Sequence, residues 1–325
     1  MYPRLKSDFY AKYVHGSLEC ASSKLKQYRK TMRKKQNTKL PYICKDMVML
    51  DNQSYKILDE YIRIPIRARQ YCVIKLASYV LEQLENTKLG SITITENKLI
   101  ISYSREIEYQ KPFDFVAIDR NLDNITMFDT KNNLSTYNLQ KANKIKERYR
   151  HVKSRFRRND VRVRKKIFQK YGTREKNRVR QILHSVSKKT VSDNKGIILE
   201  DIKGIRKLYR KGNGQRKKFR FKMNSWLFYE LQRQIEYKAR WLGLPVKYVN
   251  AAGTSSKCAA CGSKMVPEEH RMMFCPCCNV VVDRDINAAK NILARGTRVV
   301  PDATQSEAMK QSKDVEQIVL NRVGN

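Results

Sequence analysis

The sequence predicts an α/β protein with a small metal-binding ribbon built into its core. Two short apolar runs, 113–118 and 196–199, have the composition of buried strands, and each leads directly into a carboxylate, Asp119 or Glu200. Apolar residues over 179–186 recur at i, i+3, i+4 and i+7, which is the spacing of one helix face. Two Cys-x-x-Cys pairs follow near the C-terminus. Strands and helices that alternate in this way are typical of a sheet covered by helices.

The two Cys-x-x-Cys pairs are separated by thirteen residues, a spacing similar to that of the two halves of a zinc ribbon. Each pair turns two thiolates inward, and two pairs close a tetrahedron around one structural Zn²⁺. The predicted ribbon spans 258–278. Its four ligands are Cys258, Cys261, Cys275 and Cys278. Cys277 is a fifth thiol that could compete with Cys278, but the Cys-x-x-Cys spacing favours Cys275 and Cys278.

The charge of the chain is its most unusual property. Its 325 residues include 68 Lys and Arg against 31 Asp and Glu, which gives a net charge of +37. A surface this basic would repel itself without a polyanionic partner, and nucleic acid is favoured over a membrane surface. The sequence has no run of 18 apolar residues, so no membrane span is expected. Metal-type cysteine usage and the lack of an apolar leader predict a reducing, cytoplasmic location.

The composition of the N-terminal half changes twice along the chain, and the predicted secondary structure changes with it. Residues 1–40 are basic and are expected to form one or two helices. Residues 41–111 carry short β-type runs separated by Asn and Gly, which predicts a small antiparallel sheet or partial barrel. The core follows over 112–257. Its insertion, 141–190, is the most basic stretch, with twenty Lys and Arg against three acids. We expect this insertion to be a helical hairpin that turns at 171–173.

One long helix and a third strand are predicted ahead of the ribbon. Asn224 and Ser225 predict the N-cap of a helix that runs to about Trp241, and the third strand is predicted over 245–249. After the ribbon, residues 279–295 complete the core with a helix. Residues 296–325 are expected to be a polar, weakly ordered tail.

Three carboxylates stand at the ends of rigid elements, Asp119 and Glu200 after strands and Asp285 at the start of the last helix. If they meet, they cannot all stay ionised without cations, and two Mg²⁺ or Mn²⁺ ions would neutralise them. Such a pair of ions supports phosphodiester hydrolysis. The residues alone leave two choices open, because Asp283 competes with Asp285 and Asp201 competes with Glu200.

Four segments resemble the TnpB (OrfB) proteins of bacterial and archaeal insertion sequences, which are relatives of the type V CRISPR effectors. The segments are 118–124 (IDRNLDN), 197–205 (IILEDIKGI), 253–258 (GTSSKC) and 283–289 (DRDINAA). The resemblance implies an RNase H-like (RuvC) core that contains the zinc ribbon and the basic helical insertion. A helical and β N-terminal region would precede this core.

By the family pattern, the resemblance implies that the catalytic acids are Asp119, Glu200 and Asp285, the last being the Asp two residues before Asn-Ala-Ala. It implies a mobile-element-encoded, metal-dependent endonuclease that cuts DNA under the direction of a guide RNA from the element's own end. Relatives have a strand and helices ahead of what stands here at residue 1. Residues 1–40 are therefore expected to be a shortened recognition-like segment and residues 41–111 a wedge-like domain.

Two alternatives stay open. One is a truncated relative that binds nucleic acid without cleaving it, and the other is a transposase that acts directly on DNA ends. The presence of all three acids favours cleavage. Arg120, directly after Asp119, stands where many relatives carry an apolar residue. The resemblance implies the cytoplasm of a prokaryotic or viral host cell as the location.

Overall fold

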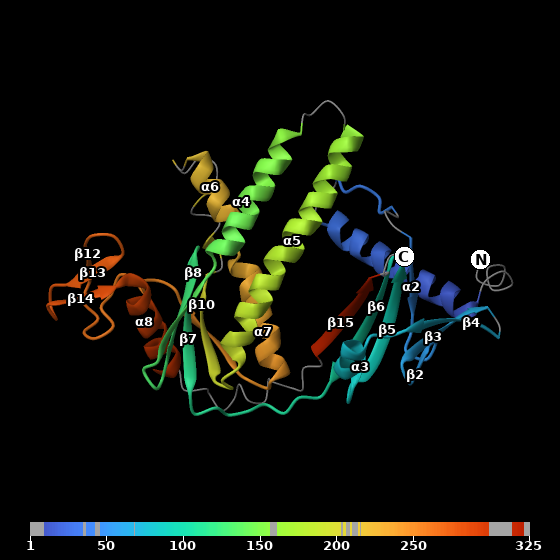
Figure 1. Ribbon diagram of the computed structural model, residues 1–325, viewed down its shortest axis with the longest axis horizontal. Coiled ribbons are helices and arrows are strands. Elements are labelled where there is room, and N and C mark those ends of the chain that lie inside the picture. The colour runs from blue at the N-terminus through green and yellow to red at the C-terminus, as the bar shows by residue number, and fades with distance from the viewer. Residues whose placement is uncertain are drawn as a thin grey trace. The chain divides into compact units, whose positions relative to one another are not determined.

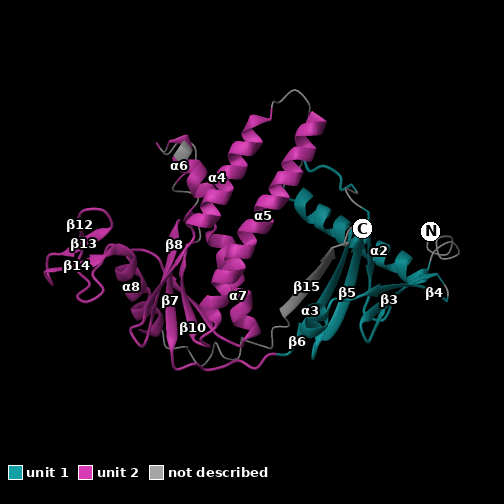
Figure 2. Ribbon diagram, viewed as in Figure 1, with its two compact units in different colours: residues 1–106, 311–325 teal, residues 107–310 magenta. Residues whose placement is uncertain are grey.

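A computed structural model gives the fold of the chain (Figure 1). It describes residues 10–34, 37–42, 46–67, 69–156, 161–202, 204–205, 209, 214, 216–298 and, for the backbone alone, 314–321. The chain divides into two compact units, one made of 1–106 with 311–325 and the other of 107–310 (Figure 2). All the predicted site residues lie in the second unit.

The described part of the first unit has two helices and two antiparallel sheets. Its elements are α2 (Ala11–Met32), β1 (Met47–Leu50), β2 (Lys56–Leu58), β3 (Tyr61–Arg67), β4 (Gln70–Lys75), α3 (Ser78–Leu84), β5 (Lys88–Thr95), β6 (Lys98–Arg105) and β15 (Asp314–Asn321). One sheet has the order β1-β5-β6-β15 and the other the order β2-β3-β4. Ile62, Ile92 and Ile101 are fully buried in a core that the two sheets share, because alternate side chains of a strand face the same side.

The C-terminal segment differs from its sequence prediction. The sequence predicts a polar tail over 296–325, whereas the last helix continues to Arg298 and residues 314–321 form the strand β15. β15 pairs antiparallel with β6 along its whole length. The physical reason is that a sheet edge offers unpaired N–H and C=O groups, and a segment rich in Val, Ile and Leu has the β propensity to pair with it.

The second unit is organised around a five-stranded mixed sheet. Its strands are β7 (Phe115–Arg120), β8 (Asn124–Asp129), β9 (Leu134–Asn138), β10 (Gly196–Asp201) and β11 (Val246–Asn250), in the order β11-β10-β7-β8-β9. β10 lies parallel to β7 and β11, whereas β7, β8 and β9 form an antiparallel meander. The three strands that the sequence predicts are confirmed. Because β7 and β10 are parallel neighbours, their carboxyl ends meet at the same edge of the sheet.

Helices cover both faces of this sheet (Figure 1). The described helices of this unit are α4 (Gln140–Arg155), α5 (Val161–Val191), α6 (Lys217–Asn224), α7 (Phe228–Trp241) and α8 (Arg284–Arg298), of which α5 and α7 cover one face and α8 the other. Leu183 of α5 and Leu231 of α7 belong to the core on one face, together with Ile118. Ile292 of α8 packs on the other face against Ile198. The mixed α/β class that the sequence predicts is confirmed.

A small antiparallel sheet stands between β11 and α8. Its strands are β12 (Val266–Pro267), β13 (Met272–Cys275) and β14 (Val280–Asp283), in the order β12-β13-β14. The ribbon therefore extends past the predicted end at residue 278. The reason is that the second cysteine pair lies on the turn between β13 and β14, and a hairpin turn needs both of its strands.

The basic hairpin turns earlier than the sequence predicts. α4 ends at Arg155 and α5 begins at Val161, so the predicted turn at 171–173 lies inside α5. Gly172 does not break this helix, because a glycine inside a helix costs only about 1 kcal/mol relative to alanine. The buried apolar stripe along the second half of α5, including Leu183, outweighs that cost.

The predicted N-cap at Asn224 and Ser225 is also wrong, because these residues end α6, and α7 begins at Phe228. Their side chains bond backwards into α6. Asn224 donates to the carbonyl of Arg220 at 2.7 Å, and Ser225 donates to the carbonyl of Lys222 at 2.8 Å. Asn and Ser side chains can bond to carbonyls three or four residues earlier as well as to N–H groups at a helix start, so composition alone does not distinguish the two.

Gly296 sets how closely α8 approaches β10. A Cβ atom here would lie 2.5 Å from Cδ1 and Cγ2 of the fully buried Ile198. Gly296→Ala is expected to lower the free energy of unfolding by about 1–3 kcal/mol, the usual effect of overpacking. The matched change Gly172→Ala meets no atom within 4 Å and is expected to raise stability by up to about 1 kcal/mol. Urea unfolding measures both, and effects of the same sign would contradict the close contact.

Candidate active site and zinc ribbon

Strand alternation puts Asp119 and Glu200 on the same face of the sheet. Successive side chains of a strand point to opposite faces. Asp119 therefore shares its face with Ala117, and Glu200 shares its face with Ile198, and this is the face that α8 covers. Asp201 falls on the opposite face, which α5 and α7 cover. Of the two acids that end β10, Glu200 is thus the one on the face of Asp119.

Asp285 comes from α8. It lies in the first turn of the helix and is 4% exposed. Asp283 precedes the helix, and its Oδ1 accepts hydrogen bonds from the backbone N–H groups of Asp285 (2.8 Å) and Ile286 (3.2 Å). This is an N-cap, so the Asp283 carboxylate is already used by the helix. Asp285 instead lies close enough to Asp119 for its charge to influence the ionisation of that residue.

Each of the three carboxylates is held by at least one polar side chain. The pairs are Asp119 with Asn121 (2.8 Å), Glu200 with Thr254, and Asp285 with Arg271 and with Asn124 (3.2 Å). Among the described residues, one set of at least three Cys, His, Asp or Glu side chains is close enough to share an ion, and it is the cysteine set of the ribbon. The three acids therefore line one edge of the sheet without converging on a single point.

The sequence prediction assigned no role to any of these partners, and two of them come from outside the sheet. Arg271 reaches Asp285 from the ribbon, and Thr254 reaches Glu200 from the loop after β11. Thr254 belongs to the Gly-Thr-Ser-Ser-Lys-Cys segment, which the family resemblance singles out and which could have indicated it. Arg271 is one of many arginines in a basic chain, so nothing in its local sequence distinguishes it.

Burial and charge act together on Asp119. The residue is 7% exposed, and burial first, then the neighbouring Glu200 carboxylate, raise the pKa of Asp119 to about 7. A divalent cation would relieve this repulsion. The available donors are oxygen atoms, which Mg²⁺ and Mn²⁺ prefer. Asn124 Oδ1, beside Asp285, is buried without a hydrogen-bond partner in the described chain and adds one more open acceptor. The donor chemistry of these residues therefore suits the implied cation.

The raised pKa of Asp119 predicts that the stability of protein prepared without Mg²⁺ or Mn²⁺ depends on pH. The folded-state pKa, about 7, lies above the ordinary value of 3.8. The folded state therefore holds this proton more tightly. The resulting contribution to the free energy of unfolding, on the order of 4 kcal/mol, is full below the ordinary pKa of 3.8 and is lost as pH rises through the folded pKa. Urea unfolding at about pH 5 and about pH 8 should show a larger loss in wild type than in Asp119→Asn. Equal losses would contradict the assignment.

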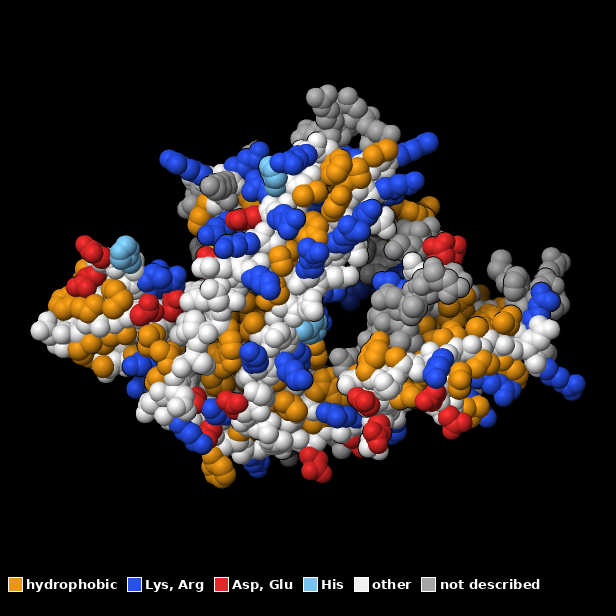
Figure 3. All heavy atoms as spheres, viewed as in Figure 1, with side chains coloured by type: hydrophobic (Ala, Val, Ile, Leu, Met, Phe, Trp, Pro, Cys, Tyr) orange, Lys and Arg blue, Asp and Glu red, His pale blue; other side chains and the backbone are white. Residues whose placement is uncertain are grey.

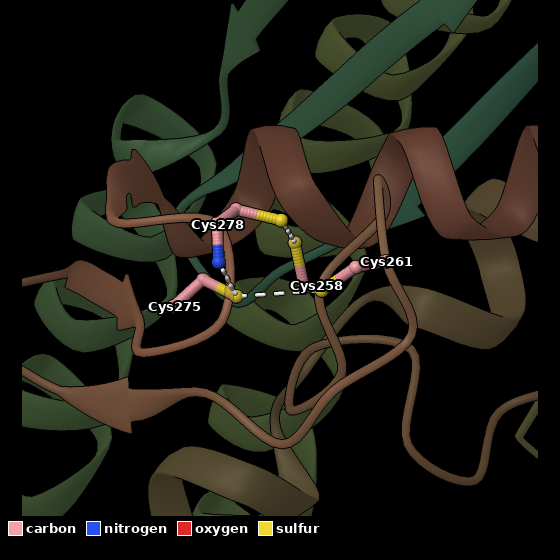
Figure 4. Close-up of side chains that lie close together, drawn as sticks. All are labelled: Cys258, Cys261, Cys275 and Cys278. Carbon is pink, nitrogen blue, oxygen red and sulfur yellow. Dashed lines mark hydrogen bonds between the residues drawn. The ribbon is translucent and has the colours of Figure 1, made fainter.

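The four predicted zinc ligands come together. The Sγ atoms of Cys258, Cys261, Cys275 and Cys278 all lie within 4.8 Å of one another, and the side chains point toward a common centre (Figure 4). Cys258 and Cys278 are 4.0 Å apart, and Cys261 and Cys275 are 3.5 Å apart. A tetrahedral site with Zn–S bonds of about 2.3 Å has S···S edges of about 3.8 Å, so the arrangement fits Zn²⁺. Cys277 is exposed and lies outside this set.

The ribbon is tied to the helix that carries Asp285. Asn287, two residues further along α8, is 2% exposed. Its Oδ1 accepts from the backbone N–H of Ala259 at 3.0 Å, and its Nδ2 donates to the carbonyl of Lys257 at 2.7 Å. One buried amide therefore connects the first cysteine pair to the first turn of α8. Holding the ribbon closed thus also holds the position of Asp285.

The basic insertion presents a cationic surface. Lys and Arg side chains are spread along the hairpin of α4 and α5 (Figure 3). Several rest on aromatic rings, such as Arg150 at 3.8 Å from the ring centre of Phe221. Of the helices that the structure describes, none is long and apolar enough to cross a membrane. A surface of this kind suits contacts with phosphate groups, which position a nucleic acid without reading its sequence.

Comparisons with known proteins agree with this architecture. A family model described as Cas12f1-like, TNB domain matches residues 228–292, which run from α7 through the ribbon into α8. A TnpB-like protein of Methanocaldococcus jannaschii is 32% identical over 264 residues, covering 75% of this chain and 94% of that protein. The CRISPR-associated endodeoxyribonuclease Cas12f1 of Sulfoacidibacillus thermotolerans is 33% identical over 74 residues, covering 22% of this chain and 17% of that protein.

Among solved structures, a chain of the Cas12f1–sgRNA–target DNA complex matches with a TM-score of 0.54 and 14% identity, covering 90% of this chain and 73% of that chain. At this identity the likeness concerns the fold. Together the sheet, its helices and the ribbon define an α/β protein with a built-in four-cysteine ribbon. The match to the Methanocaldococcus protein is extensive enough, and its identity high enough, to show the family. The chain belongs to the TnpB-like family.

Proposed function

We propose that this chain is an RNA-guided DNA endonuclease encoded by a mobile element, with a RuvC-like core of the RNase H type. The observation that carries the proposal is the arrangement of Asp119, Glu200 and Asp285, which three separate elements bring to one edge of the sheet. Relatives that match parts of the chain are named as RNA-guided DNA endonucleases or as Cas12 proteins. Sheet order β11-β10-β7-β8-β9 with one antiparallel meander supports an RNase H-like interpretation.

The three acids would hold Mg²⁺ or Mn²⁺ as catalytic ions. When bound, these ions supply an activated water and stabilise the charge on the leaving oxygen of a phosphodiester. The protein's own residues fix the acids: Asn121 orients Asp119, and Thr254 orients Glu200. Zn²⁺ would have a separate, structural role in the ribbon.

DNA and a guide RNA are the proposed partners. The net charge of +37 and the cationic α4–α5 hairpin supply phosphate contacts. In RNA-guided recognition, base pairing reads the sequence while the protein contacts the backbone, which suits a chain whose basic residues are spread over long helices. The proposed place of action is the cytoplasm of the host cell.

A cleavage assay tests the proposal. The protein is purified together with its co-expressed flanking transcript and incubated with Mg²⁺ and a plasmid library that carries the matching target. Cleavage that requires RNA, Mg²⁺ and the target is the expected result. RNA and DNA binding without any cleavage would reject the proposal in favour of a non-cleaving relative. Joining of DNA ends would indicate a transposase that acts directly.

A further inference from the structure

Arg120 is a buried cation directly behind the three acids. It follows Asp119 in β7, and by strand alternation its side chain lies on the opposite face of the sheet, toward α7. It is 4% exposed. Nη1 donates to Oε1 of Gln232 in α7, and Nη2 donates to the backbone carbonyl of Glu200, both at 2.6 Å. A single side chain thus joins β7, β10 and α7 at the edge where the acids lie.

Stability alone does not explain a guanidinium in this place. Within the described chain, Arg120 has no ion pair, and its Nε has no hydrogen-bond partner. Its partner Gln232 is itself fixed, because Gln232 Nε2 donates to Glu236 at 3.0 Å and to the Tyr248 hydroxyl at 2.9 Å. The carboxylates of Asp119, Glu200 and Glu236 lie near enough to favour its charge in part, but burial outweighs them. An apolar side chain of similar volume would often be more stable there.

The hydrogen bond from Arg120 to Glu200 lies where the pairing between β7 and β10 ends. β7 and β10 pair from Phe115 opposite Gly196 to Ile118 opposite Leu199. The next carbonyl of β10, that of Glu200, is held by the Arg120 side chain. The side chain of Glu200 points to the opposite face of the sheet, where Asp119 lies. Fixing the main chain of Glu200 therefore limits where its carboxylate can lie.

We propose that Arg120 is a positioning residue for the cation site. It clamps the backbone of Glu200 from the face opposite the acids and so keeps the Glu200 carboxylate beside Asp119. The inference rests on the proposed function, because it assumes a divalent cation among these acids. A guanidinium is needed here because two of its nitrogens donate to Gln232 and to Glu200 at once, whereas lysine has a single nitrogen.

Mn²⁺ binding to the full-length, zinc-loaded protein tests this inference without any cleavage. The measured quantity is the Mn²⁺ concentration at the midpoint of binding, followed by isothermal titration calorimetry. In Arg120→Met it is expected to rise about tenfold or more, the usual effect of losing a group that orients a metal ligand. Arg120→Lys should give a smaller rise. The control is Gln234→Leu, which removes a fully buried side chain of α7 that hydrogen-bonds with Ser187 and Glu230.

The control separates positioning from general destabilisation. Gln234→Leu should lower the melting temperature while leaving the Mn²⁺ midpoint unchanged. Equal midpoints for wild type and Arg120→Met would overturn the inference, as would equal rises in Arg120→Met and Gln234→Leu. In the cleavage assay, Arg120→Met should lower kcat with an unchanged KM for target DNA. If wild type binds Mn²⁺ in an Arg120-dependent way but cuts nothing, the cleavage function fails and the positioning role stands.

Discussion

Asp119→Ala is expected to abolish DNA cleavage, with a loss of roughly 10³-fold or more, while RNA and DNA binding remain. Asp119 is fixed by the central strand β7 and lies between the other two acids, so its removal takes a ligand from the middle of the proposed cation site. Nucleic-acid binding depends on phosphate contacts with Lys and Arg elsewhere. Because burial disfavours the Asp119 carboxylate, the variant should be at least as stable as wild type near neutral pH without Mg²⁺. Cleavage rates and filter binding measure the two effects.

Two neighbouring acids provide matched controls for this experiment. Asp283→Asn keeps an oxygen that can cap α8, and Asp201→Asn changes the face of β10 that α5 and α7 cover. Both variants should retain most of the activity, whereas Asp285→Asn and Glu200→Gln should lose it as Asp119→Ala does. Cutting by Asp119→Ala, or its loss in both control variants, would reject the assignment of the acids.

Cys275→Ser is expected to release the zinc ion, open the ribbon and reduce cleavage at least about 100-fold. Structural Zn²⁺ contributes on the order of 10 kcal/mol to the folding of small ribbons, because the site forms only in the folded state. Loss of the ribbon frees Ala259 and Lys257 from Asn287 and removes Arg271 from Asp285, so the first turn of α8 loses its supports. The zinc content per chain and limited proteolysis of the ribbon measure the structural effect.

Cys277→Ser is the control for the zinc experiment. Cys277 lies between two predicted ligands in sequence but is exposed and outside the ligand set. The variant should keep one zinc per chain and wild-type cleavage. Zinc loss in Cys277→Ser with zinc retained in Cys278→Ser would show that the fifth thiol, rather than Cys278, completes the site.

Local patterns in the sequence determined much of this description. The apolar runs that end at Asp119 and Glu200 predicted two central strands, and the periodicity over 179–186 predicted part of α5. The two cysteine pairs predicted a quartet that the structure brings together. These features follow from the two-residue repeat of a strand, the 3.6-residue repeat of a helix and the fixed ligand number of zinc. All of them can be counted along a single stretch of chain.

Only the tertiary structure decided between residues that are neighbours in sequence. Whether Glu200 or Asp201 joins Asp119 depends on the register of β10 against β7, in which Leu199 lies opposite Ile118, so that Glu200 comes beside Asp119. Asp283 is assigned to the helix cap by two backbone bonds. The contacts of Arg120 with Gln232 and Glu200 link residues about 80 or more positions apart. The turn of the basic hairpin and the pairing of β15 likewise depended on distant partners, because the burial and pairing of a segment are set by what packs against it.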